Sequence, residues 1–267
     1  MKFIRNSAAL VILVFILDIL RYFVFPDVSA LESLNPERTA FMEYRQKAWK
    51  SAGWPDRQVS HKWVPLRKIS GNLQKAVLIA EDDKFWQHEG FDYEAMERAL
   101  EKNLKERKVV MGGSTISQQL AKNLWLSPSK NPVRKIKEAI LTWRIERTLT
   151  KRRILEIYLN VAEWGDGIFG IEAAARHYYG ISAGQLSAVQ SSRLAAVLPN
   201  PIRWSPTGNT RYVRNRSAII YKVMVRRGVV VPRYREITGE EPVVEPFDTL
   251  NRGVPQFLID QALWPER

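Results

Sequence analysis

Residues 81–90 contain side chains that can act as an acid or a base. Glu81 is followed closely by further carboxylates and by aromatic side chains, at Asp82, Asp83, Phe85, Trp86 and Glu89. Like charge and shielding from water both raise a carboxyl pKa, toward the value that a general base needs at neutral pH. Glu81 is therefore a candidate general base. A solvated acidic helix end beside two core aromatics is the alternative, and the segment alone does not decide between the two.

A second candidate site begins with Gly112 and Gly113 and continues as the polar face of a helix. Its polar residues are Ser114, Thr115, Gln118, Gln119 and Lys122. Thr115 and Gln118 have the spacing of a capping box, which predicts a helix start here. A free helix N-terminus with a lysine on the same face favours an anion, and the hydroxyl and amide groups suit sugar hydroxyls. An ordinary capped helix with a polar outer face is the alternative.

A third group of polar residues follows Asn131 and Pro132, which predict a helix start as cap and first helical residue. Arg134 and Glu138 lie four residues apart and share a face, beside Lys135. A surface ion pair at this spacing contributes only about 0.2–0.5 kcal/mol. The functional alternative is a cationic cluster that holds phosphate around a second carboxylate.

The elements that must position these residues are almost all helical. Leu73, Ala76, Val77 and Ala80 recur at the spacing of an amphipathic helix that ends at Glu81. A short helix is expected over 37–50, and further helices are expected to begin near residues 92, 116, 132, 151, 170, 188 and 210. In the helix over 92–107, apolar residues share one face, opposite charged residues, at Met96, Ala99, Leu100 and Leu104. With one short strand expected over 62–65, the fold class is mainly α.

Composition limits the chemistry that the chain can perform. Its 267 residues include no cysteine, which excludes disulfides, cysteine catalysis and thiolate metal sites. The three histidines are scattered without metal-ligand spacing, so no metal site is expected. The formal net charge of +13 predicts an anionic partner, such as a phosphate, a nucleic acid or an acidic membrane surface.

Residues 8–25 are apolar apart from Asp18 and Arg21. As a helix they span about 27 Å, close to the hydrocarbon thickness of a bilayer. Lys2 and Arg5 precede them and acidic residues follow, so the positive-inside rule places the N-terminus in the cytoplasm. We expect a retained transmembrane anchor; a cleaved signal peptide is the alternative.

Six motifs along the chain resemble the peptidoglycan glycosyltransferases of glycosyltransferase family 51. They are Glu81-Asp82-x-x-Phe85-x-x-His88-x-Gly90, Gly113-Ser114-Thr115-Ile116-x-Gln118-Gln119-Leu120-x-Lys122-Asn123, Arg134-Lys135-x-x-Glu138, Ile154-Leu155-x-x-Tyr158-Leu159-Asn160, Gly170-Ile171-x-x-Ala174-Ala175 and Leu194-Ala195-x-x-Leu198-Pro199-x-Pro201. Each is weak alone, but six in order are specific. The resemblance implies a lysozyme-like, two-lobed α-helical domain with a membrane-facing hydrophobic lobe.

The resemblance also implies a substrate and residue roles. The substrate is lipid II, which is joined with inversion to a growing glycan chain while undecaprenyl pyrophosphate leaves. The catalytic residues are then Glu81, as the general base, and Glu138, which lies in the donor site and stabilises developing charge or helps to position the pyrophosphate. The pyrophosphate is bound by Lys122, Arg134 and Lys135. The sugar-binding sites are lined by Ser114, Thr115, Gln118 and Gln119. No cofactor is required, although a divalent cation stimulates some relatives.

The expected organisation follows from the anchor and the resemblance. We expect a cytoplasmic N-terminus over 1–7, an anchor over 8–25, a linker over 26–59, a periplasmic glycosyltransferase domain over 60–228 and a tail over 229–267. The protein would then reside in the bacterial inner membrane as a single-pass protein. Its partners would be lipid II, the glycan chain, the bilayer and other cell-wall synthesis or division proteins, without nucleic acid.

Two other functions fit part of the sequence. A membrane-anchored lytic glycoside hydrolase also needs carboxylates in a cleft, but a neutral glycan gives it no use for Lys122, Arg134 and Lys135. A basic, non-enzymatic module that binds nucleic acid or anionic lipid predicts that Glu81→Gln leaves function intact. The outward topology expected for the domain argues against nucleic acid.

Overall fold

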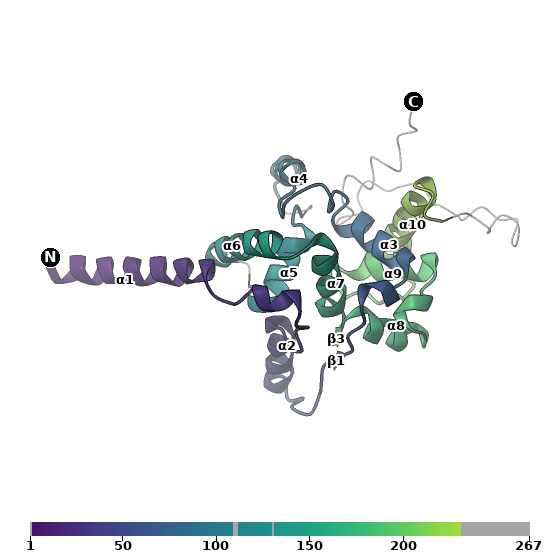
Figure 1. Ribbon diagram of the computed structural model, residues 1–267, viewed down its shortest axis with the longest axis horizontal. Coiled ribbons are helices and arrows are strands. Elements are labelled where there is room, and N and C mark those ends of the chain that lie inside the picture. Colours follow the sequence, from purple (N-terminus) through teal and green to yellow (C-terminus); the bar gives the residue numbers. More distant parts are fainter. Residues whose placement is uncertain (1, 109–111, 130, 231–267) are drawn as a thin grey trace, which may run out of the picture.

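The computed structural model describes residues 2–108, 112–129 and 131–230, and these form a mainly helical protein (Figure 1). The α-helices are α1 (Lys2–Leu20), α2 (Ala40–Ser51), α3 (Gly71–Glu81), α4 (Tyr93–Lys105), α5 (Ile116–Trp125), α6 (Pro132–Thr148), α7 (Lys151–Val161), α8 (Ile171–Tyr179), α9 (Ala188–Val197) and α10 (Arg211–Arg226). Short 3-10 helices are η1 (Arg21–Phe23), η2 (Ser29–Glu32), η3 (Leu66–Lys68) and η4 (Ala183–Gln185). The predicted mainly α class is confirmed. Most of the predicted tail, from residue 231 on, lies outside the described residues.

A small sheet accompanies the helices, in the order β1-β3-β2. Its strands are β1 (Ser60–His61), β2 (Glu163–Gly165) and β3 (Ile168–Phe169). β1 pairs with β3 in parallel and β2 pairs with β3 antiparallel. The strand expected over 62–65 was wrong, because Val64 gives both its backbone groups to the Asn160 side chain, at 2.8 and 2.9 Å, instead of to a strand.

Side-chain caps begin most of the helices where the sequence predicted them. Thr115 and Gln118 form the predicted capping box of α5, and Asn131 caps α6 with Pro132 at its start. Asp92 caps α4 by accepting a hydrogen bond from the Ala95 N–H at 2.8 Å. These caps satisfy N–H groups that have no partner inside the helix, so they fix each helix start to one residue.

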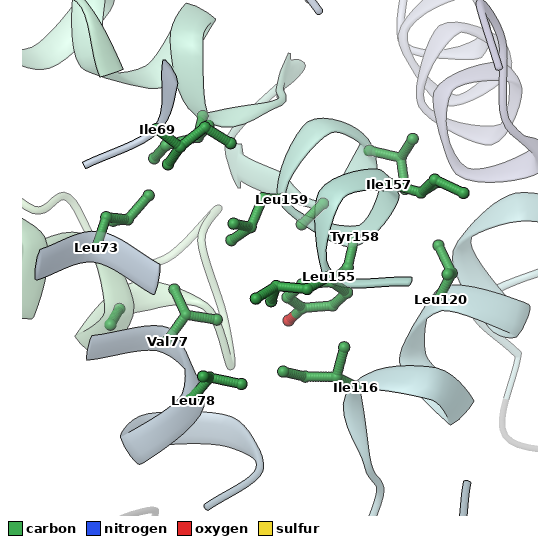
Figure 2. Close-up of a cluster of buried hydrophobic side chains, with 14 of the residues drawn as sticks. Ile69, Leu73, Val77, Leu78, Ile116, Leu120, Leu155, Ile157, Tyr158 and Leu159 are labelled. Carbon is green, nitrogen blue, oxygen red and sulfur yellow. The ribbon is translucent and has the colours of Figure 1, made fainter. Parts of the chain in front are cut away.

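The hydrophobic core lies where α3, α5 and α7 meet. Leu73, Ala76, Val77 and Ala80 are buried, as the periodicity of α3 predicted. Figure 2 shows Tyr158 of α7 between Val77 of α3 and two residues of α5, Ile116 and Leu120. α3 packs on its other side against α9 and α10, and α5 packs against α6. The ends of α3 and α5 are therefore held by a core that they share.

The apolar face of α4 does not enter this core. Leu100 and Leu104 are 59% and 68% exposed, and Tyr93 is 75% exposed, whereas Ala99 is buried. Gly113 allows this packing, because a Cβ at residue 113 would lie 3.0 Å from the Met96 backbone and 3.3 Å from the Ala99 side chain. An exposed apolar stripe of this kind marks a contact surface rather than a core element.

α1 extends away from the other helices and meets them only near its end (Figure 1). Asp18 pairs there with Arg21, at 3.0 Å and at the predicted spacing, and with Lys137 of α6. The described apolar side chains from Leu10 to Leu17 are exposed to between 44% and 61%. Among the described residues, none of the helices combines the length and the apolar character needed to cross a membrane.

The helix expected over 37–50, within the region expected to be a linker, is confirmed as α2, which packs against α5. Arg45 of α2 donates two hydrogen bonds to the Glu163 carboxylate, at 2.8 and 2.9 Å. The Trp49 indole N–H donates to Asp166 at 3.2 Å. Glu163 and Asp166 belong to the turn around β2, so α2 lies on the body of the domain rather than on a free linker.

We predict that Asn160→Ala lowers the free energy of unfolding by about 3 kcal/mol. Asn160 is fully buried, and its loss leaves the Val64 backbone groups without partners in the core, where each unsatisfied group costs about 1–3 kcal/mol. Urea unfolding followed by circular dichroism measures the change. Asn209→Ala, at an exposed asparagine, is the control; equal stability of the two variants would contradict the prediction.

Candidate active site

Glu81 is the last residue of α3, and its carboxylate is held by two other helices. Gln119 of α5 donates its side-chain N–H to Oε2 at 3.0 Å. Arg216 of α10 donates from Nη2 to Oε1 at 3.2 Å and to the Ala80 carbonyl at 3.1 Å. The Glu81 side chain is 10% exposed. It is therefore fixed in orientation while still in contact with solvent.

Burial is the largest cause of the raised pKa of Glu81. Arg216, Gln119 and Lys122 oppose it by favouring the charged form. The direction agrees with the sequence analysis, but the expected role for neighbouring carboxylates was wrong. Those carboxylates have partners of their own: Asp83 accepts two hydrogen bonds from Arg227, at 2.5 and 2.8 Å, and Asp82 is bound elsewhere.

Asp82 joins the end of α3 to the start of α5. Its Oδ2 accepts a hydrogen bond from the N–H of Ile116, the first residue of α5, at 2.8 Å. His88 donates from Nε2 to Asp82 Oδ1 at 2.9 Å. The Gly90 N–H donates to His88 Nδ1 at 3.1 Å, which leaves the imidazole proton on Nε2. A buried carboxylate at a helix N-terminus is favoured by the helix dipole, and this one brings Glu81 next to Gln119.

Gly90 has a backbone conformation that requires glycine. Its φ is +93°, and a Cβ there would lie 2.9 Å from the Thr142 methyl group. The Gly90 carbonyl accepts a hydrogen bond from Thr115 Oγ1 at 2.7 Å. The loop after Glu81 is thus tied at both ends to the start of α5.

The polar residues of α5 separate into two groups. Thr115 and Gln118 are buried, and their side chains are used in the capping box. Ser114 is exposed, while Gln119 and Lys122 are half-buried on the face toward Glu81. The Gln119 carbonyl oxygen accepts a hydrogen bond from the Tyr158 hydroxyl at 3.0 Å, so its amide N–H points to Glu81.

Glu138 of α6 is a second buried carboxylate, with only 2% of its surface exposed. One oxygen pairs with Arg134 and the other pairs with Lys135. Lys135 also donates to Ser114 Oγ at 3.2 Å, which connects α6 to the start of α5. The interpretation of Arg134 and Glu138 as an ordinary surface ion pair was wrong, because the Glu138 carboxylate is buried and two cations compensate its charge.

Lys122 interacts electrostatically with both carboxylates, Glu81 and Glu138. Its charge is coupled to that of Glu138 and to that of Glu81, while burial lowers the pKa of its ammonium group. Within the described ranges, no carboxylate lies within 4.0 Å of Lys122 Nζ. The ring of Phe41 on α2 lies close to this ammonium group, with its centroid 5.4 Å from Nζ. The structure thus brings Glu81, Gln119, Lys122, Glu138 and their cationic neighbours to one region.

Two residues of this region were missed in the sequence analysis. Phe41 lies in the short helix expected over 37–50, and nothing local marks it as a site residue. Arg216 does carry a signal, because it lies on the apolar face of α10, three residues after Val213 and four before Ile220, and an arginine there needs a buried partner. It is 1% exposed, and the partner is Glu81.

The fold and the site define an enzyme with two buried carboxylates in cationic surroundings, suited to a negatively charged substrate. Comparison with known proteins is specific: a family model described as Transglycosylase matches residues 47–225. The chain belongs to the transglycosylase family.

Its curated relatives share most of its length. It is 46% identical over 226 residues to the biosynthetic peptidoglycan transglycosylase of Herminiimonas arsenicoxydans, covering 84% of this chain and 97% of that protein. It is 49% identical over 216 residues to the protein of the same name from Aromatoleum aromaticum, covering 79% and 94%. For that of Nitrosospira multiformis the identity is 46% over 210 residues, covering 77% and 89%.

We predict that Arg216→Gln raises the pKa of Glu81 further. Arg216 lowers this pKa while burial raises it, so removal of the guanidinium leaves burial less opposed and the carboxyl keeps its proton to a higher pH. A ¹³C NMR titration of glutamate-labelled protein, with the signal assigned by Glu81→Gln, measures the shift. Arg226→Gln, at an exposed position of the same helix, is the control; an unchanged or lowered Glu81 pKa in Arg216→Gln would contradict the assignment.

Proposed function

We propose that the chain polymerises lipid II by an inverting mechanism. Membership of the transglycosylase family makes it a peptidoglycan glycosyltransferase of cell-wall synthesis. In the proposed reaction, the 4-hydroxyl of an incoming lipid II attacks C1 of the growing chain. The bond from C1 to undecaprenyl pyrophosphate breaks, the hydroxyl proton passes to the enzyme, and the lipid pyrophosphate leaves.

Glu81 is proposed as the base that takes the hydroxyl proton. Burial raises its pKa, which makes the carboxylate more basic than an exposed glutamate, whereas Arg216 and Gln119 oppose this by favouring the charged form. The two donors also fix both oxygens, so the carboxylate presents a constant geometry to the acceptor. Partial exposure leaves room for the hydroxyl to approach.

The cationic cluster is the observation that carries the proposal. Arg134 and Lys135 compensate the buried Glu138, and Lys122 adds a further charge without a carboxylate partner among the described residues. Three cations around one carboxylate leave a positive surplus that matches a pyrophosphate diester. Cations that wait in place for a leaving group stabilise its developing charge without reorganisation during the reaction.

Ser114 and Gln119 are proposed to bind the sugars, because the Ser114 side chain is exposed and the Gln119 side chain is only half-buried. Thr115 and Gln118 were predicted to line the sugars too. Because their side chains are buried in the capping box, we infer that they act by fixing the start of α5. Glu138 is proposed to hold Arg134 and Lys135 in the donor site rather than to transfer a proton.

We predict that Glu81→Gln lowers the rate of lipid II polymerisation by about 100-fold or more while binding persists, because a carboxamide keeps the shape but cannot accept the proton. Purified full-length protein in detergent is given labelled lipid II, with and without a divalent cation, and glycan chains are resolved on gels. Glu32→Gln, at an exposed carboxylate outside the site, is the control for loss of a negative charge. Polymer from Glu81→Gln at the wild-type rate would overturn the base assignment.

The hydrolase alternative gives a different product in the same experiment. A lytic enzyme would release soluble fragments from preformed glycan strands and would form no polymer from lipid II. That result from the wild-type protein would overturn the proposed reaction, including the role of the cationic cluster.

We further propose a single-pass inner-membrane protein with a periplasmic domain, anchored through residues 8–25. The exposed apolar side chains of α1 support this location, as do Lys2 and Arg5 before them. Arg144 of α6 donates to the carbonyls of Tyr22 and Val24, at 3.0 and 2.8 Å, so the end of the anchor is attached beside the donor-site helix. The exposed face of α4 is proposed to rest on the same bilayer.

We predict that Leu100→Ser with Leu104→Ser weakens binding of an anchor-deleted protein, residues 26–267, to phospholipid vesicles by about tenfold. Each exposed leucine that enters the lipid contributes about 1.5–3 kcal/mol, of which partial insertion realises a fraction. Vesicle flotation measures the bound fraction. Val189→Ser with Ile202→Ser removes two other exposed apolar side chains as a control, and equal effects of the two pairs would contradict the role of α4.

A further inference from the structure

We propose that α2 is part of the active site, and that Phe41 is a positioning residue for Lys122. The proposal rests on the proposed function, in which Lys122 binds the pyrophosphate leaving group. It assigns a positioning role to a helix that precedes all six sequence motifs and lies in the region expected to link the anchor to the domain.

The contact between Phe41 and Lys122 has the geometry of a cation–π interaction. Lys122 Nζ lies 5.4 Å from the centroid of the Phe41 ring, within the range of about 6 Å over which a ring face attracts an ammonium group. Both side chains are half-buried, so the attraction is only partly screened by water. The ring thereby limits the directions in which a long, flexible lysine can point.

The electrostatic surroundings of Lys122 make this contact important. Glu81 of α3 and Glu138 of α6 favour its charged form, whereas Arg134 and Lys135 of α6 and its own burial disfavour it. Neither carboxylate forms an ion pair with Nζ within 4.0 Å, since Glu138 is occupied by Arg134 and Lys135, and Glu81 by Arg216. A ring face supports the ammonium charge without neutralising it, so the charge stays available to a phosphate.

The position of Phe41 is fixed from both ends of α2. Thr39 caps the helix by accepting a hydrogen bond from the Met42 N–H at 3.2 Å. One turn further, Arg45 bonds to Glu163 through two hydrogen bonds, and Trp49 bonds to Asp166. Trp49 also packs over Gly167, where a Cβ would lie 2.0 Å from its ring. The turn at residues 163–167 therefore gains a function: it holds α2 so that Phe41 faces Lys122.

The test compares Phe41→Leu with Phe41→Tyr in the full-length protein. Leucine keeps an apolar side chain but removes the ring face, while tyrosine keeps it. We expect Phe41→Leu to lower kcat for lipid II polymerisation by about three- to tenfold with little change in KM, the size of a partly buried cation–π contact. We expect Phe41→Tyr to retain the wild-type kcat. Tyr44→Leu, at a 47% exposed ring on the same helix, is the matched control.

A second readout is independent of activity. In a ¹³C NMR titration of lysine-labelled protein, Phe41→Leu should lower the pKa of Lys122, because the charged form loses a stabilising contact. The basic limb of the pH–rate profile should shift to lower pH by the same amount. Arg45→Gln, which loosens α2 without touching Lys122, should shift both in the same direction by less. In a Lys122→Met background, Phe41→Leu should have no further effect on kcat.

The outcomes separate the two proposals. If the wild-type protein forms no polymer but Phe41→Leu still lowers the Lys122 pKa, the proposed function fails and the contact stands. If polymer forms and Phe41→Leu leaves the Lys122 pKa and the pH profile unchanged, or its effect adds fully to that of Lys122→Met, the role of Phe41 is overturned. Equal thermal unfolding of Phe41→Leu and Tyr44→Leu excludes general loss of structure as the cause.

Discussion

The site depends on one buried interaction, the hydrogen bond from the N–H of Ile116 to the carboxylate of Asp82. It joins the C-terminal end of α3 to the N-terminal end of α5, and His88 and Gly90 complete it from the intervening loop. Glu81 precedes Asp82 by one residue and Gln119 follows Ile116 by one helical turn. Their contact therefore follows from the geometry of the Asp82 link. Replacing that link by a flexible contact would leave both side chains present without fixing either.

The charges of the site are arranged so that each buried carboxylate has a compensating partner on a packed helix. Glu138 pairs with Arg134 and Lys135, four and three residues before it in α6. Glu81 is instead compensated by Arg216 from α10, on the other side of the core. Uncompensated burial would cost several kcal/mol per charge, so the two pairs are conditions for folding as much as for chemistry. Lys122 differs from both carboxylates: Glu138 and Glu81 favour its charge from a distance, the Phe41 ring lies 5.4 Å from Nζ, and none of the described carboxylates lies within 4.0 Å of it.

What could be predicted from sequence was local. The stripe of α3 and the capping box of Thr115 and Gln118 follow from spacings within one or two turns, and the structure confirmed them. Glu81 and Glu138 were named as chemical candidates, and the structure places them in one region with Lys122. Local pattern also misled: Leu100 and Leu104 have the periodicity of a core face yet are exposed, because amphipathic spacing says nothing of what covers the apolar side.

The remainder depends on contacts between distant parts of the chain. Arg45 and Glu163 are 118 residues apart, and Arg216 and Glu81 are 135 apart, so no spacing rule connects them. Contacts of this kind matter for the proposed function as well as for the fold: α2 contributes no residue to the six motifs, but its Phe41 ring lies 5.4 Å from Lys122 Nζ. A helix that carries no motif can therefore belong to an active site. It does so when the fold packs a suitable surface of that helix, here an aromatic ring, against a residue of a motif.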